Sequence, residues 1–575
     1  MKISARQGLG ATTVETEARP VSLTTPSPST TRSRTTLGLA VLLAVLCLVW
    51  FVPLGGRALL SPDEGRYASL ALEMARSGDW VTPRLNGLIY FEKPAFQYWV
   101  GALAFLAFGV SEFTARLWPA VAGFLTLLAV GFTAARLWDR ETGLRALAIA
   151  ASMTWVVGNS HFLTLDAGLT LFLTLALCAV LLAHAEGDAR ARRRWIWLAW
   201  AAMAGAVLSK GLVGIAIPGA VLVAVTVWRR DLSLWRGMHW ASGLAIFFLL
   251  AAPWFLLVSA RNPSFAQFFF IHEHFARYLT KVHQREGAWW YYVPLLIGGL
   301  LPWTSALPWA FRKDPAEAGR VRITARDVLL VWCVFVFLFF SASGSKLPSY
   351  ILPMFPALAL LIAMQLRRAA PSTLRWHLLF PVLAWVALFI VLLAPARFAS
   401  STTPVEVMAA LATGARAGAA IFLVGACVAW WCLGRGRVTA AVLALALGHL
   451  AATLVVMQSH NTYGQLKSAA TLAPVLQPLM AADTPVFAVG SYDQTLPFYL
   501  RRDVVLVDYV DEFALGQSLE PKRWIPTLDE FAERWQSLPQ AVAYMSPATW
   551  AQLQQRGLPM RIVFQDQRRI VVARQ

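Results

Sequence analysis

The sequence predicts an α-helical polytopic membrane protein with about thirteen transmembrane helices, a long first external loop containing surface helices, and a small C-terminal α/β domain. Of its 575 residues, 58% are hydrophobic and 14% are charged, whereas a soluble domain carries about 25% charged residues. The apolar residues gather in runs of about 15 to 21, the length at which a helix crosses a hydrocarbon core about 30 Å thick. Backbone polar groups in such a core must be paired within the segment, so the runs are expected to be helices.

The net charge of +19 comes largely from arginines that lie in short clusters between apolar runs. This placement is typical of cytoplasmic loops beside anionic headgroups and does not indicate a nucleic-acid partner. We therefore expect these clusters on the same side of the membrane as the N-terminal tail. They lie at residues 140–145, 190–194, 229–236, 312–326, 367–375 and 435–437.

The same rule selects which apolar runs span the membrane. The runs lie near 37–54, 96–109, 117–137, 146–160, 167–184, 196–209, 212–228, 241–258, 291–311, 328–342, 350–365, 378–394, 418–433 and 439–457. The basic clusters share one side only if one run before residue 137 does not cross. The run 96–109 is too short to span and contains Gln97 and Trp99, which suit an interfacial position. Thirteen spans remain, with the N-terminus inside, the C-terminus outside and an external loop over 55–116.

Three regions follow from these patterns. Residues 1–36 are rich in Ser, Thr, Pro and Arg and are predicted to be a disordered cytoplasmic tail. Residues 37–458 form the transmembrane domain. Residues 459–575 are expected to be an external α/β domain, with helical stretches at 528–537 and 548–555 and no nucleotide-binding fingerprint. Its predicted strands lie at 485–489, 504–507, 541–544 and 569–572.

The first external loop carries two adjacent acids, Asp63 and Glu64. Ser61 can cap a helix here, with Pro62 at its first position and both acids in the first turn, where the helix dipole favours them. The acids therefore have a structural interpretation as well as a functional one.

Asp166 is a second candidate, because it ends a span on the side where the Asp63 loop is expected. An acid at the edge of an apolar bundle is costly unless it pairs or functions. The alternative is that Asp166 caps the helix that begins near residue 167.

Isolated cations recur in the external loops, which otherwise hold little charge. They are Lys93, Lys210, Arg277 and Lys346. Cations at the membrane edge beside tyrosines such as Tyr67, Tyr90 and Tyr350 suit a lipid phosphate. For any single cation, snorkelling to the interface is the alternative.

A weak metal signal lies in the external loop 259–290. His272 and His274 flank Glu273, and on a regular helix two such histidines point away from each other. They could bind one ion only in extended backbone or at a helix end. A third ligand such as Glu92 would have to come from another loop.

These residues carry a resemblance to a known family. The Asp63-Glu64 pair after the first span, the Glu92-Lys93-Pro94 sequence, Asp166 after the third span and the stretch 346–350 resemble the membrane glycosyltransferases of the C fold (GT-C). More closely, the sequence from about residue 37 to 575 is similar to the protein mannosyltransferase-like group and, within it, to the lipid A aminoarabinose transferases. The pair is Asp-Glu rather than the Asp-x-Asp of oligosaccharyltransferases, which argues against a catalytic divalent metal.

The resemblance implies a multi-pass enzyme of the bacterial inner membrane with a periplasmic active site. It would transfer 4-amino-4-deoxy-L-arabinose from undecaprenyl phosphate to lipid A phosphates, giving resistance to polymyxin and cationic peptides. Asp63 and Asp166 match the catalytic acids, and Glu92, His272 and His274 match a structural zinc site. A monomer without a nucleotide cofactor is expected. The implied substrate-binding residues are Arg66, Tyr67, Tyr90, Lys93, Lys210, Arg277, Lys346 and Tyr350.

Two alternatives stay open. A related enzyme could transfer another prenyl-phosphate sugar to a protein or a glycan. A transporter or flippase for a lipid-linked sugar belongs to a different class. Transporters often have internal repeats and ionisable groups near the membrane midplane. Here no repeat is visible, and the charged groups gather at span ends, which favours an enzyme.

Overall fold

The computed structural model describes residues 28–276, 287–312 and 323–574, without the side chains of 28–37 and 274–276. The chain forms two compact units, residues 1–50 and 51–575. Helix α1 (Pro28–Phe51) begins well before the predicted start at residue 37. The last part of the predicted tail is therefore helical.

Nine segments within the described residues are long and apolar enough to cross a membrane, or ten if one bent pair counts as a span. The bent pair is α13 (Tyr292–Gly299) with Thr304–Ala310, which turns by 110°. The nine segments are Gly38–Gly55, α4 (Glu112–Leu137), α7 (Asp166–Ala185), α11 (Trp240–Arg261), α15 (Ala325–Ala342), η5–α16 (Pro348–Leu366), α17 (Pro371–Val391), α18 (Val405–Gly434) and α19–α20 (Val438–Leu466).

The multi-span helical fold is confirmed, but the predicted number of thirteen spans is not. The predicted span 146–160 is divided between α5 (Arg140–Ser152) and α6 (Thr154–His161), because Met153 is extended. Helix α9 (Val213–Arg229) has only 17 residues. Helix α8 (Ala189–Lys210) is long enough, but its first turns consist of arginines. Apolar composition alone did not reveal these breaks.

The first loop contains two helices joined by a two-stranded hairpin. Helix α2 (Asp63–Ser77) ends at Gly78, whose φ of 68° suits glycine. The hairpin pairs β1 (Arg84–Leu85) with β2 (Leu88–Ile89), and α3 (Phe96–Phe108) follows. Helix α3 has 13 residues and is not among the candidate spans, as expected.

The predicted basic loops meet at one end of the helices. The Arg145 guanidinium donates to the Thr439 hydroxyl at 2.9 Å, and Arg229 forms an ion pair with Asp327. Asp166 begins α7, and Glu186, which follows its last residue, lies 3.5 Å from Arg136. Because α7 has 20 residues, at 1.5 Å per residue Asp166 lies about 30 Å from the basic end.

The predicted C-terminal α/β domain is confirmed. Its five-stranded sheet has the order β4-β3-β5-β7-β6, with β3 parallel to β4 and β5 and with β7 antiparallel to its neighbours. Phe531 and Trp535 of α24 (Leu528–Ser537) pack on the sheet, and α25 (Pro547–Gln554) follows β5. The strands are β3 (Val486–Val489), β4 (Val505–Val507), β5 (Val542–Met545), β6 (Met560–Gln565), which the sequence pattern did not reveal, and β7 (Ile570–Arg574).

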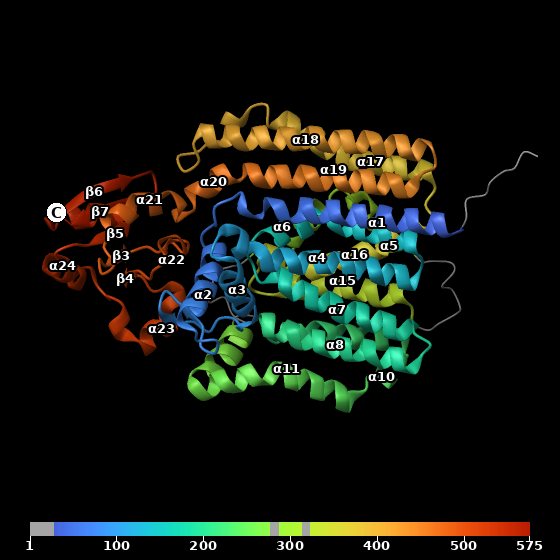
Figure 1. Ribbon diagram of the computed structural model, residues 1–575, viewed down its shortest axis with the longest axis horizontal. Coiled ribbons are helices and arrows are strands. Elements are labelled where there is room, and N and C mark those ends of the chain that lie inside the picture. Colours follow the sequence, from blue (N-terminus) through green and yellow to red (C-terminus); the bar gives the residue numbers. More distant parts are fainter. Residues whose placement is uncertain (1–27, 277–286, 313–322, 575) are drawn as a thin grey trace, which may run out of the picture. The chain divides into compact units, whose positions relative to one another are not determined.

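The C-terminal domain packs directly on the first loop (Figure 1). Leu70, Leu85 and Leu88 of that loop share a buried cluster with Leu496 and Phe513 of the domain. Short helices such as α22 (Leu496–Leu500), η9 (Asp511–Phe513) and α23 (Ala514–Leu519) form the domain side of this contact. The domain therefore borders the region where the candidate residues lie.

Candidate active site

A polar cavity of about 370 Å³ opens beside the first loop. Its walls come from α2, α6, the start of α7, the end of α8 and the segment η5 (Pro348–Met354). These elements are far apart in the sequence and are brought together only by the helix packing. Eight of the predicted site residues line this one cavity: Asp63, Arg66, Tyr67, Glu92, Lys93, Asp166, Lys210 and Tyr350.

Asp166 is held at the cavity wall by two polar partners. Its side chain forms an ion pair with the Lys210 ammonium, and the Ser349 hydroxyl donates to its other oxygen at 2.7 Å. The Lys210 ammonium also lies 4.5 Å from the centre of the Tyr350 ring. Asp166 is the first residue of α7, but no side chain caps that helix. Both carboxylate oxygens are engaged with side chains of other segments, so the capping interpretation does not describe this acid.

Asp63 lines the same cavity and is more accessible than Asp166: 48% of the Asp63 side chain is exposed, against 7% for Asp166. It accepts from the Arg66 guanidinium at 2.8 Å. The expected Ser61 cap is wrong: the N-cap position is Pro62, without a side-chain hydrogen bond. The Ser61 hydroxyl instead donates to the Gln494 amide oxygen at 2.6 Å, because the C-terminal domain lies over the start of α2.

Lys93 pairs with an acid that sequence reasoning did not select as a site residue. Its ammonium donates to Glu273 at 3.0 Å and to the Glu92 carbonyl at 2.6 Å. Glu273 is buried in the π-helical segment η2 (Gln267–Ala276). An ammonium that faces a buried carboxylate is held in place, which differs from a lysine that snorkels towards water.

Two predicted tyrosines lie beside the cavity as neutral phenols. Burial raises the pKa of both Tyr67 and Tyr90 well above its ordinary value. Tyr67 lines the cavity and stacks on Tyr98, whereas Tyr90 is buried and does not line it. The Tyr67 ring can therefore donate a hydrogen bond to a ligand or pack against it without carrying charge.

Four other predicted residues are not among those shown to line the cavity: Lys346, Arg277, His272 and His274. The Lys346 ammonium donates to the Ser343 carbonyl at 2.6 Å and is not a lining residue. Arg277 and the His274 side chain lie outside the described residues. The His272 ring lies 3.6 Å from the Glu273 carboxylate. Within the described ranges no three His, Cys, Asp or Glu residues form a metal-binding group, so the zinc site stays a prediction.

Glu64 is a residue whose role the sequence did not reveal. Its carboxylate accepts from the Arg116 guanidinium at 2.7 Å and from the backbone amides of Leu60 and Leu163, each at 3.0 Å. Burial opposes the charged form, but the charges of Arg116 and Arg57 and the hydrogen bonds from Arg116 and Leu163 lower the pKa of Glu64 below its ordinary value. Since Leu163 belongs to the loop before Asp166, Glu64 ties the Asp63 segment to the Asp166 segment.

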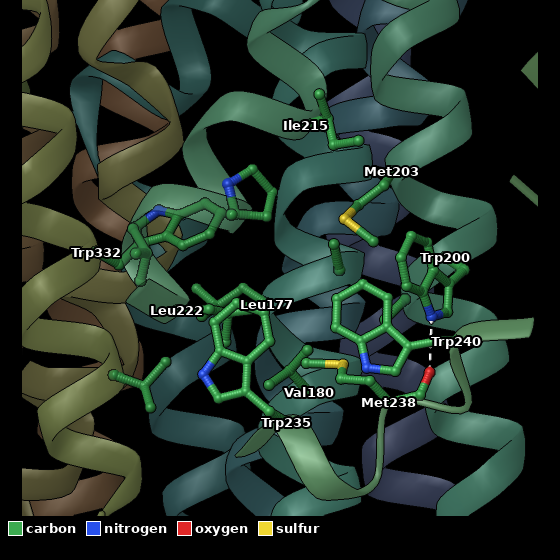
Figure 2. Close-up of a pocket in the computed structure, with 16 residues that line it drawn as sticks. Leu177, Val180, Trp200, Met203, Ile215, Leu222, Trp235, Met238, Trp240 and Trp332 are labelled. Carbon is green, nitrogen blue, oxygen red and sulfur yellow. Dashed lines mark hydrogen bonds between the residues drawn. The ribbon is translucent and has the colours of Figure 1, made fainter. Parts of the chain in front are cut away.

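A second cavity, of about 150 Å³, is apolar and lies among α7, α8, α9 and α15 (Figure 2). Its walls include Trp200, Trp235 and Trp332. The indole N–H groups of all three donate to protein oxygens, for example Trp200 to the Met238 carbonyl at 3.0 Å. Among the residues that the structure describes, no titratable side chain lines it, so the polar cavity is the candidate active site.

The fold and the site together define a polytopic membrane protein of the GT-C class. A family model described as dolichyl-phosphate-mannose-protein mannosyltransferase matches residues 35–269, and one described as the aminoarabinose transferase C-terminal domain matches residues 472–574. The chain is also similar to the crystal structure of ArnT from Cupriavidus metallidurans bound to undecaprenyl phosphate. The TM-score is 0.88 at 37% identity, over 93% of this chain and 98% of that chain.

Two curated relatives extend this likeness. Undecaprenyl phosphate-α-4-amino-4-deoxy-L-arabinose arabinosyl transferases of Edwardsiella ictaluri and Pseudomonas aeruginosa are each 37% identical, over 57% and 56% of this chain. The chain spans 59% and 58% of the length of these relatives. Because the likeness to the Cupriavidus protein covers nearly all of both chains, this chain belongs to the ArnT family of aminoarabinose transferases.

Proposed function

We propose that this protein transfers 4-amino-4-deoxy-L-arabinose from undecaprenyl phosphate to a phosphate group of lipid A, at the periplasmic face of the bacterial inner membrane. The acceptor is proposed from the chemistry of the cavity and the family resemblance. Capping of lipid A phosphates lowers negative surface charge, from which resistance to polymyxin and cationic peptides follows. We expect the enzyme to act as a monomer.

The observation that carries this proposal is that Asp63, Lys93, Asp166 and Lys210 line one cavity at an end of the helices. A polyprenyl carrier is too apolar to leave the bilayer, so its phosphate must be met at the membrane edge. Cations on the cavity wall suit that phosphate, and acids on the same wall suit an amino sugar.

The membrane side follows from the charges at the other end of the helices. The basic loops lie at the end of α7 remote from Asp166. Loops rich in arginine and lysine remain in the cytoplasm. The cavity would then face the periplasm, where the lipid A acceptor is available.

In the proposed reaction the bond between the anomeric carbon and the donor phosphate oxygen breaks, and an acceptor phosphate oxygen forms the new bond to that carbon. The transition state resembles an oxocarbenium ion, and cations near the departing phosphate stabilise the charge that it gains. Lys93 and Arg277 are proposed to share this role. An ionised acceptor phosphate needs no strong base, so Asp63 is proposed to bind the sugar ammonium or to orient the acceptor.

A structural zinc ion is part of the proposal. Glu92, His272 and His274 would hold it and so connect the first loop to η2. Carboxylate and imidazole are common zinc ligands. Zinc analysis of the purified protein, compared with a His272→Ala variant, tests this assignment, and equal zinc content in the two proteins would contradict it.

The proposed activity is tested by expressing the chain in a strain that makes the donor but lacks this transferase. Mass spectrometry of lipid A should then show aminoarabinose linked to phosphate. Asp63→Ala and Lys93→Ala should abolish the product while the protein still inserts. Wild-type protein that gives no modified lipid A, or full activity in both variants, would overturn the proposal.

A further inference from the structure

We propose that Glu512, in the C-terminal domain, is a positioning residue for the charged cavity: it holds the Arg66 guanidinium and, through Arg66, sets the position of the Asp63 carboxylate. The C-terminal domain then completes the active site in addition to covering it. This inference rests on the proposed transfer reaction.

The Arg66 guanidinium lies between two carboxylates that belong to different parts of the chain. One of its terminal nitrogens donates to Asp63 at 2.8 Å, and its Nε forms an ion pair with Glu512. Arg66 itself is buried. Asp63 is 48% exposed, whereas only 4% of the Glu512 side chain is exposed. The cavity therefore meets Asp63 directly, while Glu512 acts from behind Arg66.

Glu512 is itself held in place by Gln494, which also contacts the first loop. The Gln494 side-chain amide donates to the other Glu512 oxygen at 2.9 Å. The Gln494 side-chain oxygen accepts from Ser61 at 2.6 Å, and its backbone carbonyl accepts from Ser69. A chain of hydrogen bonds thus runs from the start of α2 through the C-terminal domain and back to Asp63.

The charges explain why two carboxylates share one guanidinium. If Asp63 were its only partner, Arg66 would neutralise the one acid that faces the cavity. With an ionised Glu512 on its other side, the three side chains together carry one net negative charge, and Asp63 is the accessible carboxylate. Burial raises the pKa of Glu512, and Arg66 opposes that rise. A negative Asp63 suits a cationic sugar, which is the substrate class of the proposed reaction.

Glu512 is not needed merely to attach the domain, because other contacts do this. Glu520 of the same domain forms an ion pair with Arg84 of the hairpin at 2.9 Å. Asn86 exchanges hydrogen bonds with the backbone of Val504. Neither Glu520 nor Arg84 lines the cavity. Glu520 is therefore a matched control: an interdomain carboxylate paired with an arginine that does not line the cavity.

The test compares donor turnover by purified wild-type protein, E512Q, E512D, E520Q, R66Q and the double variant R66Q/E512Q. E512Q is expected to lower kcat by about tenfold to a hundredfold, because Asp63 is proposed to orient the substrates and a small misplacement of bound substrate costs up to about a hundredfold in rate. The donor KM should change less than kcat, and E512D should recover part of the rate. If Glu512 acts through Arg66, the double variant should be no slower than R66Q. E520Q should retain wild-type kcat.

Each outcome decides the inference. If the wild-type protein is active and E512Q turns over the donor as fast as E520Q, the inference is wrong. A double variant slower than R66Q by the full E512Q factor would also overturn it, because this would mean that the two residues act independently. If E512Q and E512D both fail to fold while E520Q folds, Glu512 is structural and the inference is wrong. If the wild-type protein inserts and binds undecaprenyl phosphate but transfers no sugar, the proposed reaction is wrong. That result would not contradict the contact between Glu512 and Arg66.

Discussion

Replacement of Glu64 by alanine should destabilise the protein more than the loss of an ordinary ion pair. Arg116 is 0% exposed and its guanidinium donates to both Glu64 oxygens, each at 2.7 Å. Without Glu64, this buried charge keeps only the carbonyls of Leu54, Arg57 and Ala58. Removing one partner of a buried ion pair costs about 3–5 kcal/mol.

Two backbone amides lose their acceptor in the same variant. The N–H groups of Leu60 and Leu163 both donate to Glu64, and a buried donor left unpaired costs about 1–3 kcal/mol. A loss of at least about 3 kcal/mol in the free energy of unfolding is therefore expected. At about 2 °C per kcal/mol, the value for larger single domains, the melting temperature should fall by about 6 °C.

Thermal unfolding of the purified protein in detergent, followed by tryptophan fluorescence, measures this change, because the chain has 25 tryptophans. Glu141→Ala is the control. Glu141 also pairs with an arginine at 2.8 Å, but its side chain is 65% exposed, so its loss should cost less than about 1 kcal/mol. Equal melting temperatures for the Glu64→Ala and Glu141→Ala variants would refute the reasoning.

Three further predictions concern charge and topology. Asp166→Asn should lower turnover by about a hundredfold, because the Lys210 ammonium loses its charged partner; unchanged turnover would contradict a role for this acid. The folded-state pKa of Glu64 is lowered, so its contribution to stability is present above its unfolded pKa of about 4.3 and is lost as pH falls through the lower folded value. The difference in melting temperature between wild type and Glu64→Ala should therefore shrink only below about pH 4, and shrinkage near pH 7 would show that another group is responsible. A reporter fused after residue 112 should be periplasmic and one fused after Gly436 cytoplasmic, and a cytoplasmic signal from the first fusion would overturn the assigned sides.

Several features of the site could be predicted from single residues. Asp63 was selected as one of two adjacent acids in the first external loop, and Asp166 because an acid at the edge of an apolar bundle is costly. Both line the same cavity. Lys93 and Lys210 were selected because they break the charge bias of the external loops. Such signals exist because the membrane penalises charge, so the charges that remain in the external loops stand out.

Other features gave no signal in the sequence. Glu512 and Gln494 lie in a domain whose sequence is that of an ordinary α/β unit. The contact of Glu512 with Arg66 and that of Gln494 with Ser61 each cross more than 400 positions of the chain. Glu64 was a candidate helix-start residue, but its main partner, Arg116, lies 52 positions away. No local pattern encodes a partner at such a distance.

The sequence by itself determined the polytopic helical fold, the basic loops and the C-terminal α/β domain, because hydrophobic length and charge bias act locally along the chain. Only the tertiary structure decided which predicted spans are broken or bent and which charged groups meet in the cavity. It also revealed that the C-terminal domain reaches Asp63 through Arg66 and Glu512. The physical reason is that burial forces charged groups to find partners, and those partners are determined by the packing of distant segments.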